Sequence, residues 1–490
     1  MGIARKLTFG GGAVLALVAG VVAVRTVTFN AAVADGADIR LATAPTADVP
    51  GAARRLSEAV RFLTISHQDA ADNRPEEWAR FQQWLVATYP AVHRAMRREV
   101  IAGGTLVYHW PGRDAAAQPI ILMAHQDVVP VTPGTEKDWK YPPFSGAIAE
   151  NAVWGRGTVD DKGSLIALFE GLEGLAASGF TPRRSVYLVS SHDEEVLGKG
   201  AVAAAQLLES RKVQALFTLD EGSAIILDTP VIDAPAILIG VAEKGYATLK
   251  VTANAAGGHS SMPPKDTGVV NLAKAILAIN EAAFPIELKG PAADMIAVLG
   301  GAAGGTTRMA VANQWLFGPL LREQVAATPS GAAAFHTTIA PTMLNGSPKE
   351  NVLPQSASAL INYRIAPWNR STDIMDRARE ATRGMPVDLA WSRQPNEPSK
   401  ISSTSSRGWQ LVAAAARPHA PGAPISPYLV VGGTDSRNFE GISDDVYRFM
   451  PMHFTIKGAT MIHGTNEHMT LANLKRMIDF YATLVATSAG

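Results

Sequence analysis

The sequence of 490 residues contains no cysteine, and this absence restricts its chemistry. Disulfide bonds and thiolate catalysis are excluded, so a metal site would have to use His, Asp and Glu side chains. An excess of charge of one sign is missing as well, because 44 basic residues balance 44 acidic ones. Binding to nucleic acid needs a basic surface, and no nucleic-acid partner is therefore expected.

The first forty residues differ in character from the rest of the chain. Two basic residues precede an apolar, glycine-rich run over residues 7–24, which is at the short end of what can span a bilayer. Residues 32–34 (Ala-Val-Ala) offer a signal-peptide cleavage site. Residues 1–40 are expected to be a signal peptide or, preferably, a membrane anchor, with a buried helix as the alternative; residues 41–55 are expected to be a linker. The protein would then be membrane-anchored and outward-facing, or secreted or periplasmic after cleavage.

Short, mainly apolar runs alternate with a helical pattern in the first half of the chain. Residues 120–123, 185–189 and 215–217 are typical of strands that are buried on both faces of a sheet. Residues 165–172, between the first two runs, show helical spacing. This alternation predicts an α/β fold with a mostly parallel sheet covered by helices. In such folds the active site lies beyond the carboxyl ends of the strands.

A second, smaller domain is indicated after Lys244. Residues 246–252 alternate between apolar and polar, which is typical of a half-exposed antiparallel strand. We therefore predict an inserted α+β lid or dimerisation domain over residues 244–397. The catalytic domain would comprise residues 56–243 and 398–490.

Acidic residues and a histidine follow the predicted buried strands and occupy one loop between them. Taken singly, each is a satisfied polar residue or a helix cap more often than a ligand. Together they would crowd like charges at one edge of the sheet, which is costly unless cations neutralise them. One histidine with several carboxylates suits zinc, cobalt or manganese. In chain order, these residues are His125, Asp127, Asp160, Glu194, Glu195, Asp220 and Glu221.

Five motifs spread over residues 60–485 give the chain a resemblance to a known family. It resembles the two-zinc metallopeptidases that include aminoacylase, carboxypeptidase S, succinyl-diaminopimelate desuccinylase and glutamate carboxypeptidases. The carboxypeptidase S branch, with its N-acyl-amino-acid hydrolases, is the most similar. The motifs are His125-Gln126-Asp127 for H-x-D, residues 155–163 for G-R-G-x-x-D-x-K-G, Asp193-Glu194-Glu195 for D-E-E, residues 257–263 for G-G-H-S-S-x-P, and residues 463–467 for H-G-x-N-E.

The resemblance implies a centre of two zinc ions, for which cobalt or manganese could substitute. Asp160 would bridge the two metals. His125 and Asp220 would complete one set of ligands, although the neighbouring Glu221 is an alternative to Asp220. The other set would be completed by Glu195 and His463.

The resemblance also assigns catalytic and substrate-binding roles. Glu194 would be the general base, and Asp127 would accept the second N–H of the His125 ring. His259, in the inserted domain, would stabilise the oxyanion, often across a homodimer interface in relatives. Arg364 is a candidate clamp for a substrate carboxylate, with a surface salt bridge as its alternative. Arg437 is a candidate substrate contact.

These residues together predict a zinc-dependent hydrolase that cleaves the amide or peptide bond next to a C-terminal free amino acid. The alternative is an N-acyl (fatty-acyl) amino acid hydrolase or synthase, which an apolar cleft lined by the Gly/Ala-rich residues 290–342 would favour. A distant alternative is a catalytically silent, membrane-tethered binding protein. The substrate would be a dipeptide or an N-acyl amino acid.

Overall fold

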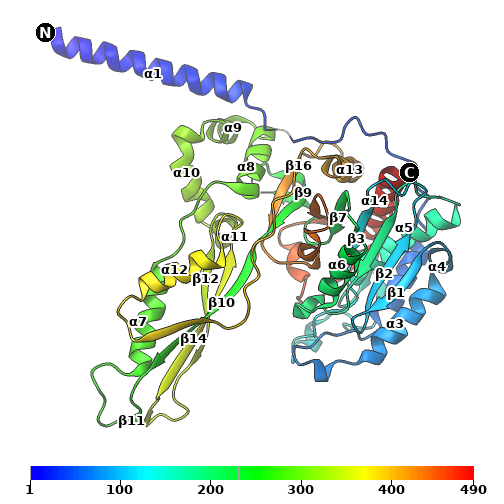
Figure 1. Cartoon of the computed structure of the whole chain (residues 1–490). Helices are drawn as coiled ribbons and strands as arrows, with labels where there is room; N and C mark the ends of the chain where they lie inside the picture. The colour runs from blue at the N-terminus through cyan, green and yellow to red at the C-terminus, as the bar shows by residue number, and fades with distance from the viewer. Residues whose placement is uncertain (1, 32, 230) are drawn as a thin grey trace.

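A large, mainly parallel sheet forms the centre of the protein (Figure 1). The computed structural model describes the backbone of residues 2–31, 33–229 and 231–490 and the side chains of these residues except 2–13 and 330. Ten strands of the described chain belong to this sheet, and β16 joins it by pairing in parallel with β9. In the order of the sheet, the other strands are β1 (Arg97–Ile101), β2 (Thr105–Trp110), β6 (Val186–Ser190), β3 (Ile120–Met123), β7 (Phe217–Asp220), β17 (Val446–Arg448), β9 (Ala234–Glu243), β8 (Ile225–Thr229) and β18 (His453–Phe454), with β16 at Ile425–Val430.

Helices cover both faces of this sheet, and every residue of its central strands β3, β6 and β7 is buried. In β3, Ile120 and Leu122 pack into the larger core, and Ile121 and Met123 pack against α6 (Gly200–Ser210) on the opposite face. The fold class predicted from the sequence is confirmed. The larger core is completed by α2 (Val49–Val60), α3 (Pro75–Thr88), α4 (Pro90–Ala95), α5 (Lys162–Ala177), α13 (Arg407–Ala416) and α14 (Leu471–Ala489).

A separate antiparallel sheet is built from residues between 245 and 391. Along β14 (Ser356–Ile365), side chains alternate between buried and half-buried, and the buried ones pack against α7 (Gly268–Glu281) and α12 (Ser371–Ala381). The order of this sheet is β12 (Thr338–Asn345), β14, β10 (Gly245–Asn254) and β15 (Val387–Trp391). The short pair β11 (Gly258–His259) and β13 (Val352–Leu353) lies at the end farthest from the large sheet (Figure 1).

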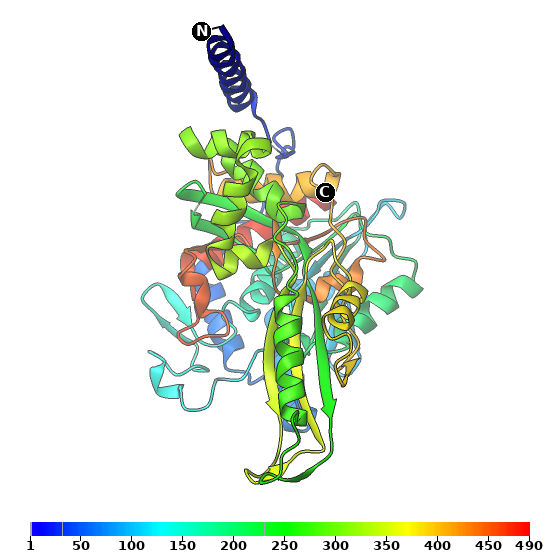
Figure 2. The ribbon, with the colours of Figure 1, turned by 90° about the vertical axis from the view of Figure 1, so that its left-hand side faces the viewer.

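The Gly/Ala-rich part of the insertion forms four helices in the described chain. They are α8 (Gly290–Ala302), α9 (Gly305–Ala312), α10 (Gln314–Ala326) and α11 (Pro329–Ala334). Helix α8 packs against β16 and β9 of the large sheet, and α9 contacts the N-terminal helix α1 (Gly2–Thr28). Figure 2 shows these helices stacked above the small sheet. In the described chain the insertion therefore consists of two parts: the small antiparallel sheet with α7 and α12, and the group of helices α8–α11.

Helix α1 does not support the predicted membrane anchor. Across the part of the chain that the structure describes, no helix combines the length and the apolar character needed to cross a membrane. The predicted cleavage site at residues 32–34 includes residue 32, which lies outside the described residues.

A third small sheet, β19 (His468–Thr470), β5 (Ala152–Trp154) and β4 (Ala147–Ala149), lies beside α14.

Candidate active site and metal centre

The carboxyl ends of three neighbouring parallel strands position most of the predicted site. Strand β3 pairs in parallel with both β6 and β7, so the residues that follow each strand meet at one edge of the sheet. His125 follows β3, Glu195 follows β6, and Glu221 follows β7. Asp160 comes from the loop that leads into α5. This is the convergence that the sequence pattern predicts.

The converging side chains form two groups that share Asp160. One group is His125, Asp160 and Glu221, and the other is Asp160, Glu195 and His463; in each, the potential ligand atoms lie within 4.8 Å of one another. His125 Nε2 is 2.9 Å from Asp160 Oδ1. His463 Nε2 is 3.0 Å from Asp160 Oδ2 and 3.1 Å from Glu195 Oε2. Asp160 thus offers one oxygen to each group, which is the geometry of a bridging ligand.

The geometry favours Glu221 over Asp220 as the partner of His125, a choice that the sequence left open. Asp220 is the last residue of β7, and its Oδ2 accepts the backbone N–H of Ser436 at 3.0 Å. Its carboxylate belongs to neither group of potential ligands, whereas that of Glu221 lies with His125 and Asp160. Asp220 nevertheless lines the same small hollow as His125 and Glu221. Sequence spacing alone left this choice open.

The chemistry of the site fits divalent cations. Hydrogen bonds to Asp160 and Glu195 raise the pKa of His463 to about 10. Burial raises the pKa values of Glu195 and Glu221. Glu195 Oε1 is buried and has no hydrogen-bond partner among the described residues. Buried carboxylates that repel one another and leave an oxygen unsatisfied are stabilised by coordinated cations.

Asp127 holds the loop that carries the two glutamates. Its carboxylate accepts the backbone N–H groups of Glu194 at 3.2 Å and Glu195 at 3.1 Å, and the hydroxyl of Ser66 at 2.7 Å. The ring Nδ1 of His125 is 3.0 Å from the backbone oxygen of Asp127 and 3.4 Å from its Oδ1. Asp127 therefore contacts the His125 ring as expected, with its backbone oxygen closer than its carboxylate.

A buried ion pair between Arg156 and Glu467 joins the loop that carries Asp160 to the loop that carries His463. No role was predicted from the sequence for either residue of this pair. Glu467 Oε1 accepts three backbone N–H groups of residues 157–160, at 2.9 to 3.2 Å. Glu467 Oε2 is 2.6 Å from Arg156 Nη1, and Arg156 Nη2 donates to the carbonyl of His463 at 3.1 Å. Both residues stand inside the quoted motifs, which is the signal that could have found them.

His259, one of the predicted residues of the inserted domain, lies away from this centre within one chain (Figure 1). His259 is exposed in β11, and its Nδ1 accepts the backbone N–H of Ser261 at 3.1 Å. Arg364 is half-buried in β14, with its guanidinium carbon 4.8 Å from the centre of the Tyr246 ring. Arg437 lies outside the inserted domain, in the turn Asp435–Phe439. Its Nε and Nη2 bind the buried carboxylate of Glu243 at 3.0 and 2.7 Å.

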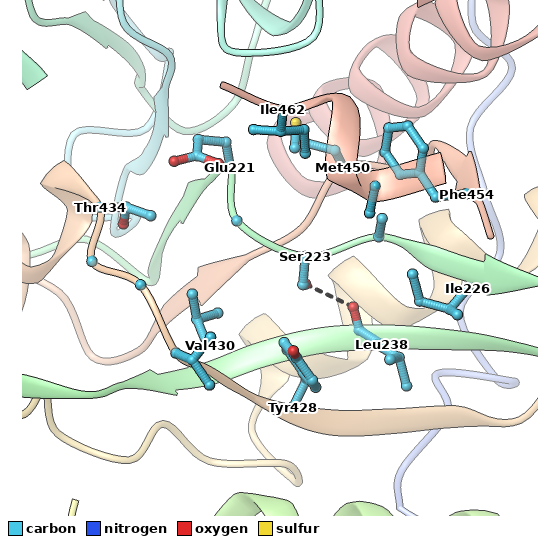
Figure 3. Close-up of a pocket in the computed structure, with 16 residues that line it drawn as sticks. Glu221, Ser223, Ile226, Leu238, Tyr428, Val430, Thr434, Met450, Phe454 and Ile462 are labelled. Carbon is cyan, nitrogen blue, oxygen red and sulfur yellow. Dashed lines mark hydrogen bonds between the residues drawn. The ribbon is translucent and has the colours of Figure 1, made fainter. Parts of the chain in front are cut away.

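A largely apolar pocket opens beside Glu221. Its volume is about 310 Å³, and its walls come from β8, β9 and β16 together with the segment that precedes His463 (Figure 3). Glu221 and Thr434 lie at one end, and Ile226 and Phe454 lie toward the other (Figure 3). The Gly/Ala-rich residues 290–342, whose lining of an apolar cleft would have favoured the N-acyl alternative, contribute no wall to this pocket.

Comparison with known proteins identifies the family of this chain. A family model described as peptidase family M20/M25/M40 matches residues 121–487. The chain belongs to this family. It is 34% identical over 439 residues to a probable carboxypeptidase S-like 2 of Dictyostelium discoideum, with 88% of this chain and 84% of the relative covered. It is 33% identical to the N-fatty-acyl-amino acid synthase/hydrolase PM20D1 of Xenopus tropicalis, with 88% and 85% covered.

Solved structures support the same fold. An M20 family metallo-carboxypeptidase from Sulfolobus solfataricus superposes with a TM-score of 0.66 at 16% identity, over 89% of this chain and 98% of that one. Human carnosine dipeptidase 1 gives 0.61 at 14% identity, over 90% and 96%. The resemblance predicted from the motifs is confirmed. The chain is a hydrolase of a metal-dependent peptidase family, and two groups of candidate ligands are present in it.

Proposed function

We propose that the protein uses two zinc ions to hydrolyse the amide bond next to a free C-terminal amino acid, as a carboxypeptidase S-like enzyme. The observation that carries this proposal is the pair of ligand groups that share Asp160. His125 and Glu221 complete one set, and Glu195 and His463 complete the other. Zinc ions held in this way would act as Lewis acids and would lower the pKa of a bound water molecule to about 7.

Glu194 is the proposed general base. It lines the same small hollow as His125 and Glu221, and the hydrogen bond from its backbone N–H to Asp127 fixes its position. Burial raises the pKa of its carboxyl, which suits a group that takes a proton from water and returns it to the leaving amine. The predicted division of labour between Glu194 and Glu195 is kept in this proposal.

A homodimer is proposed because His259 needs a second chain to reach an active site. Its place in β11, at the far end of the inserted domain, makes contact with the metal groups of its own chain impossible without a large domain movement (Figure 1). Met343 and Leu344, 64% and 73% exposed, lie in the edge strand β12 and offer an apolar surface for pairing. Sedimentation of the purified protein tests this assembly.

Arg364 and Arg437 remain the proposed contacts for the substrate carboxylate. Arg364 has no carboxylate partner within 4.0 Å in the described chain, so its charge is available to an anion. Arg437 keeps one nitrogen, Nη1, outside its bonds to Glu243 and to the carbonyl of Lys244. Neither cation is part of the lining of the apolar pocket, although Arg437 shares the carboxylate of Glu243 with Thr434 of that lining. Export by way of the N-terminal segment is part of the proposal, and N-terminal sequencing of the mature protein tests it.

Hydrolysis of N-acyl amino acids is the second candidate function, and the apolar pocket beside Glu221 favours it. The pocket volume of about 310 Å³ is at the lower end of the range for small-molecule sites. Apart from Glu221 its wall has no charged side chain, so it suits the uncharged acyl part of a substrate. A dipeptide with a protonated amino group would use little of this apolar surface.

Release of free amino acid from matched substrates tests both candidates. Purified protein would be loaded with zinc and offered dipeptides and N-acyl amino acids that share one C-terminal residue, with and without chelator. Zinc-dependent release from dipeptides supports the carboxypeptidase, and preference for acyl amino acids supports the second candidate. Protein with two bound zinc ions that releases no amino acid from either class would contradict the proposal.

A further inference from the structure

The apolar pocket contains one tyrosine whose hydroxyl is not used by the protein. Tyr428 belongs to β16, and its side chain extends toward the interior of the pocket beside Leu238 and Val430 (Figure 3). No hydrogen bond from its hydroxyl to another described residue occurs. Burial raises the pKa of this hydroxyl, so it stays protonated and can donate. Tyr428 is half-buried and its hydroxyl is not among the fully buried groups, so this hydroxyl is open to the pocket, where a bound molecule can supply its partner.

Ser223, another polar side chain of the pocket, has its own hydrogen-bond partners in the protein. The hydroxyl of Ser223 is 2.7 Å from the carbonyl of Leu238 and also contacts the carbonyl of Arg448. It accepts the backbone N–H of Gly240 at 3.1 Å. Ser223 therefore ties β9 to the loop after β7, and Tyr428 keeps a free donor in a wall that is otherwise mainly apolar.

The position of Glu221 orients a substrate in this pocket. Glu221 belongs to a ligand group, so the reacting carbonyl has to lie at that end of the pocket. A free carboxylate is repelled by Glu221 and finds no Lys, Arg or His in the lining. The carboxylate end of the substrate therefore points out of the pocket, and the acyl chain extends inward past Tyr428 toward Phe454 (Figure 3).

We propose that the acyl chain accepted here carries an oxygen function, a hydroxyl or keto group, at a carbon remote from the amide, and that Tyr428 binds this oxygen. The proposal rests on the N-acyl-amino-acid function argued above. An unsubstituted chain would bury the Tyr428 hydroxyl without a partner, which disfavours its binding. An oxygenated chain satisfies the hydroxyl and keeps the rest of the apolar contact. Tyr428 is thus a specificity-determining residue for the acyl group.

Matched substrate pairs test this proposal with the zinc-loaded full chain. Each pair would have the same amino acid and acyl length, with the hydroxyl placed at successive carbons in one series and absent in the other. The wild type is expected to favour the best hydroxylated chain in kcat/KM by roughly three- to tenfold, the worth of one neutral hydrogen bond. Tyr428→Phe should abolish this preference by lowering kcat/KM on the hydroxylated chain to the value on the plain chain.

The control variant is Tyr141→Phe, which removes a tyrosine hydroxyl outside the pocket and should keep the wild-type preference. Equal rates on plain and hydroxylated chains at every position would overturn the proposal while leaving N-acyl-amino-acid hydrolysis intact. So would a preference that survives in Tyr428→Phe. Failure of the wild type to hydrolyse any acyl amino acid, while it releases amino acid from dipeptides, would overturn the N-acyl function and this inference together.

Discussion

The two groups of candidate metal ligands share Asp160 but are held in different ways. His125 is 3% exposed, and its backbone N–H donates to Asp161 while its ring contacts Asp127. His463, in the other group, is 51% exposed and lies in a loop with a positive φ of 59°. The first group is therefore built on the ends of buried strands, and the second depends on a surface loop.

This difference predicts two metal positions of unequal affinity. A ligand that is fixed before the metal arrives loses little conformational freedom on binding, whereas a loop ligand has to be ordered. The His463 loop is held by the buried pair of Arg156 and Glu467 and by hydrogen bonds of Asn466 to the backbone of residues 138 and 140. The metal bound by Glu195 and His463 is expected to leave first when chelator is added.

Replacing the shared ligand should have the largest effect. Asp160→Ala removes an oxygen from both groups, so the variant is expected to bind neither zinc ion tightly and to lose turnover by at least about a thousandfold. Metal content after gel filtration and amino acid release measure the two effects. Retention of two zinc ions by a folded Asp160→Ala protein would show that Asp160 does not link the groups.

Replacing the proposed base should separate chemistry from metal binding. Glu194 belongs to neither ligand group, so Glu194→Gln is expected to keep both zinc ions and to lose about 10²- to 10⁴-fold in kcat. The exposed Glu209 of α6 provides a matched control, because Glu209→Gln should behave as the wild type. Loss of zinc from Glu194→Gln would instead make Glu194 a ligand.

The comparison of the two groups is sharpened by a variant that weakens the buried ion pair beneath the His463 loop. Glu467→Gln weakens the ion pair with Arg156 and the hydrogen bonds to residues 157–160. Supports of this kind change metal affinity by about 10- to 100-fold. Stepwise chelation should therefore release the first zinc ion at lower chelator concentration, with the second release shifted less.

The control for this variant is Glu150→Gln, which removes an exposed acid that pairs with Lys140 near the same loop. It should leave both steps of chelation unchanged. If Glu467→Gln shifted both steps equally, the ion pair would support the shared Asp160 more than the His463 loop. An unchanged titration would show that the loop is ordered by other contacts.

More of the large sheet than of the candidate metal centre could be predicted from the sequence. Continuous apolar runs such as residues 120–123 predict doubly buried strands, and the polar residues after them predict the edge at which the site lies. The helices of residues 290–342 were not readable, since Gly and Ala carry little periodic signal. The contact between Glu467 and Arg156 joins positions 311 residues apart in the chain. Spacing within either motif cannot report such a contact.

The choice between Asp220 and Glu221 shows the same limit and leads to the smallest expected effect. Asp220 accepts the backbone N–H of Ser436, and an asparagine oxygen can do the same. Asp220→Asn is therefore expected to keep two zinc ions and to lose less than about tenfold in kcat/KM, the worth of one altered hydrogen bond. Glu221→Gln, one residue along, should lose one zinc ion because its carboxylate faces His125 and Asp160. Metal analysis of the pair distinguishes the two acids, and loss of zinc from Asp220→Asn but not from Glu221→Gln would restore Asp220 as the ligand.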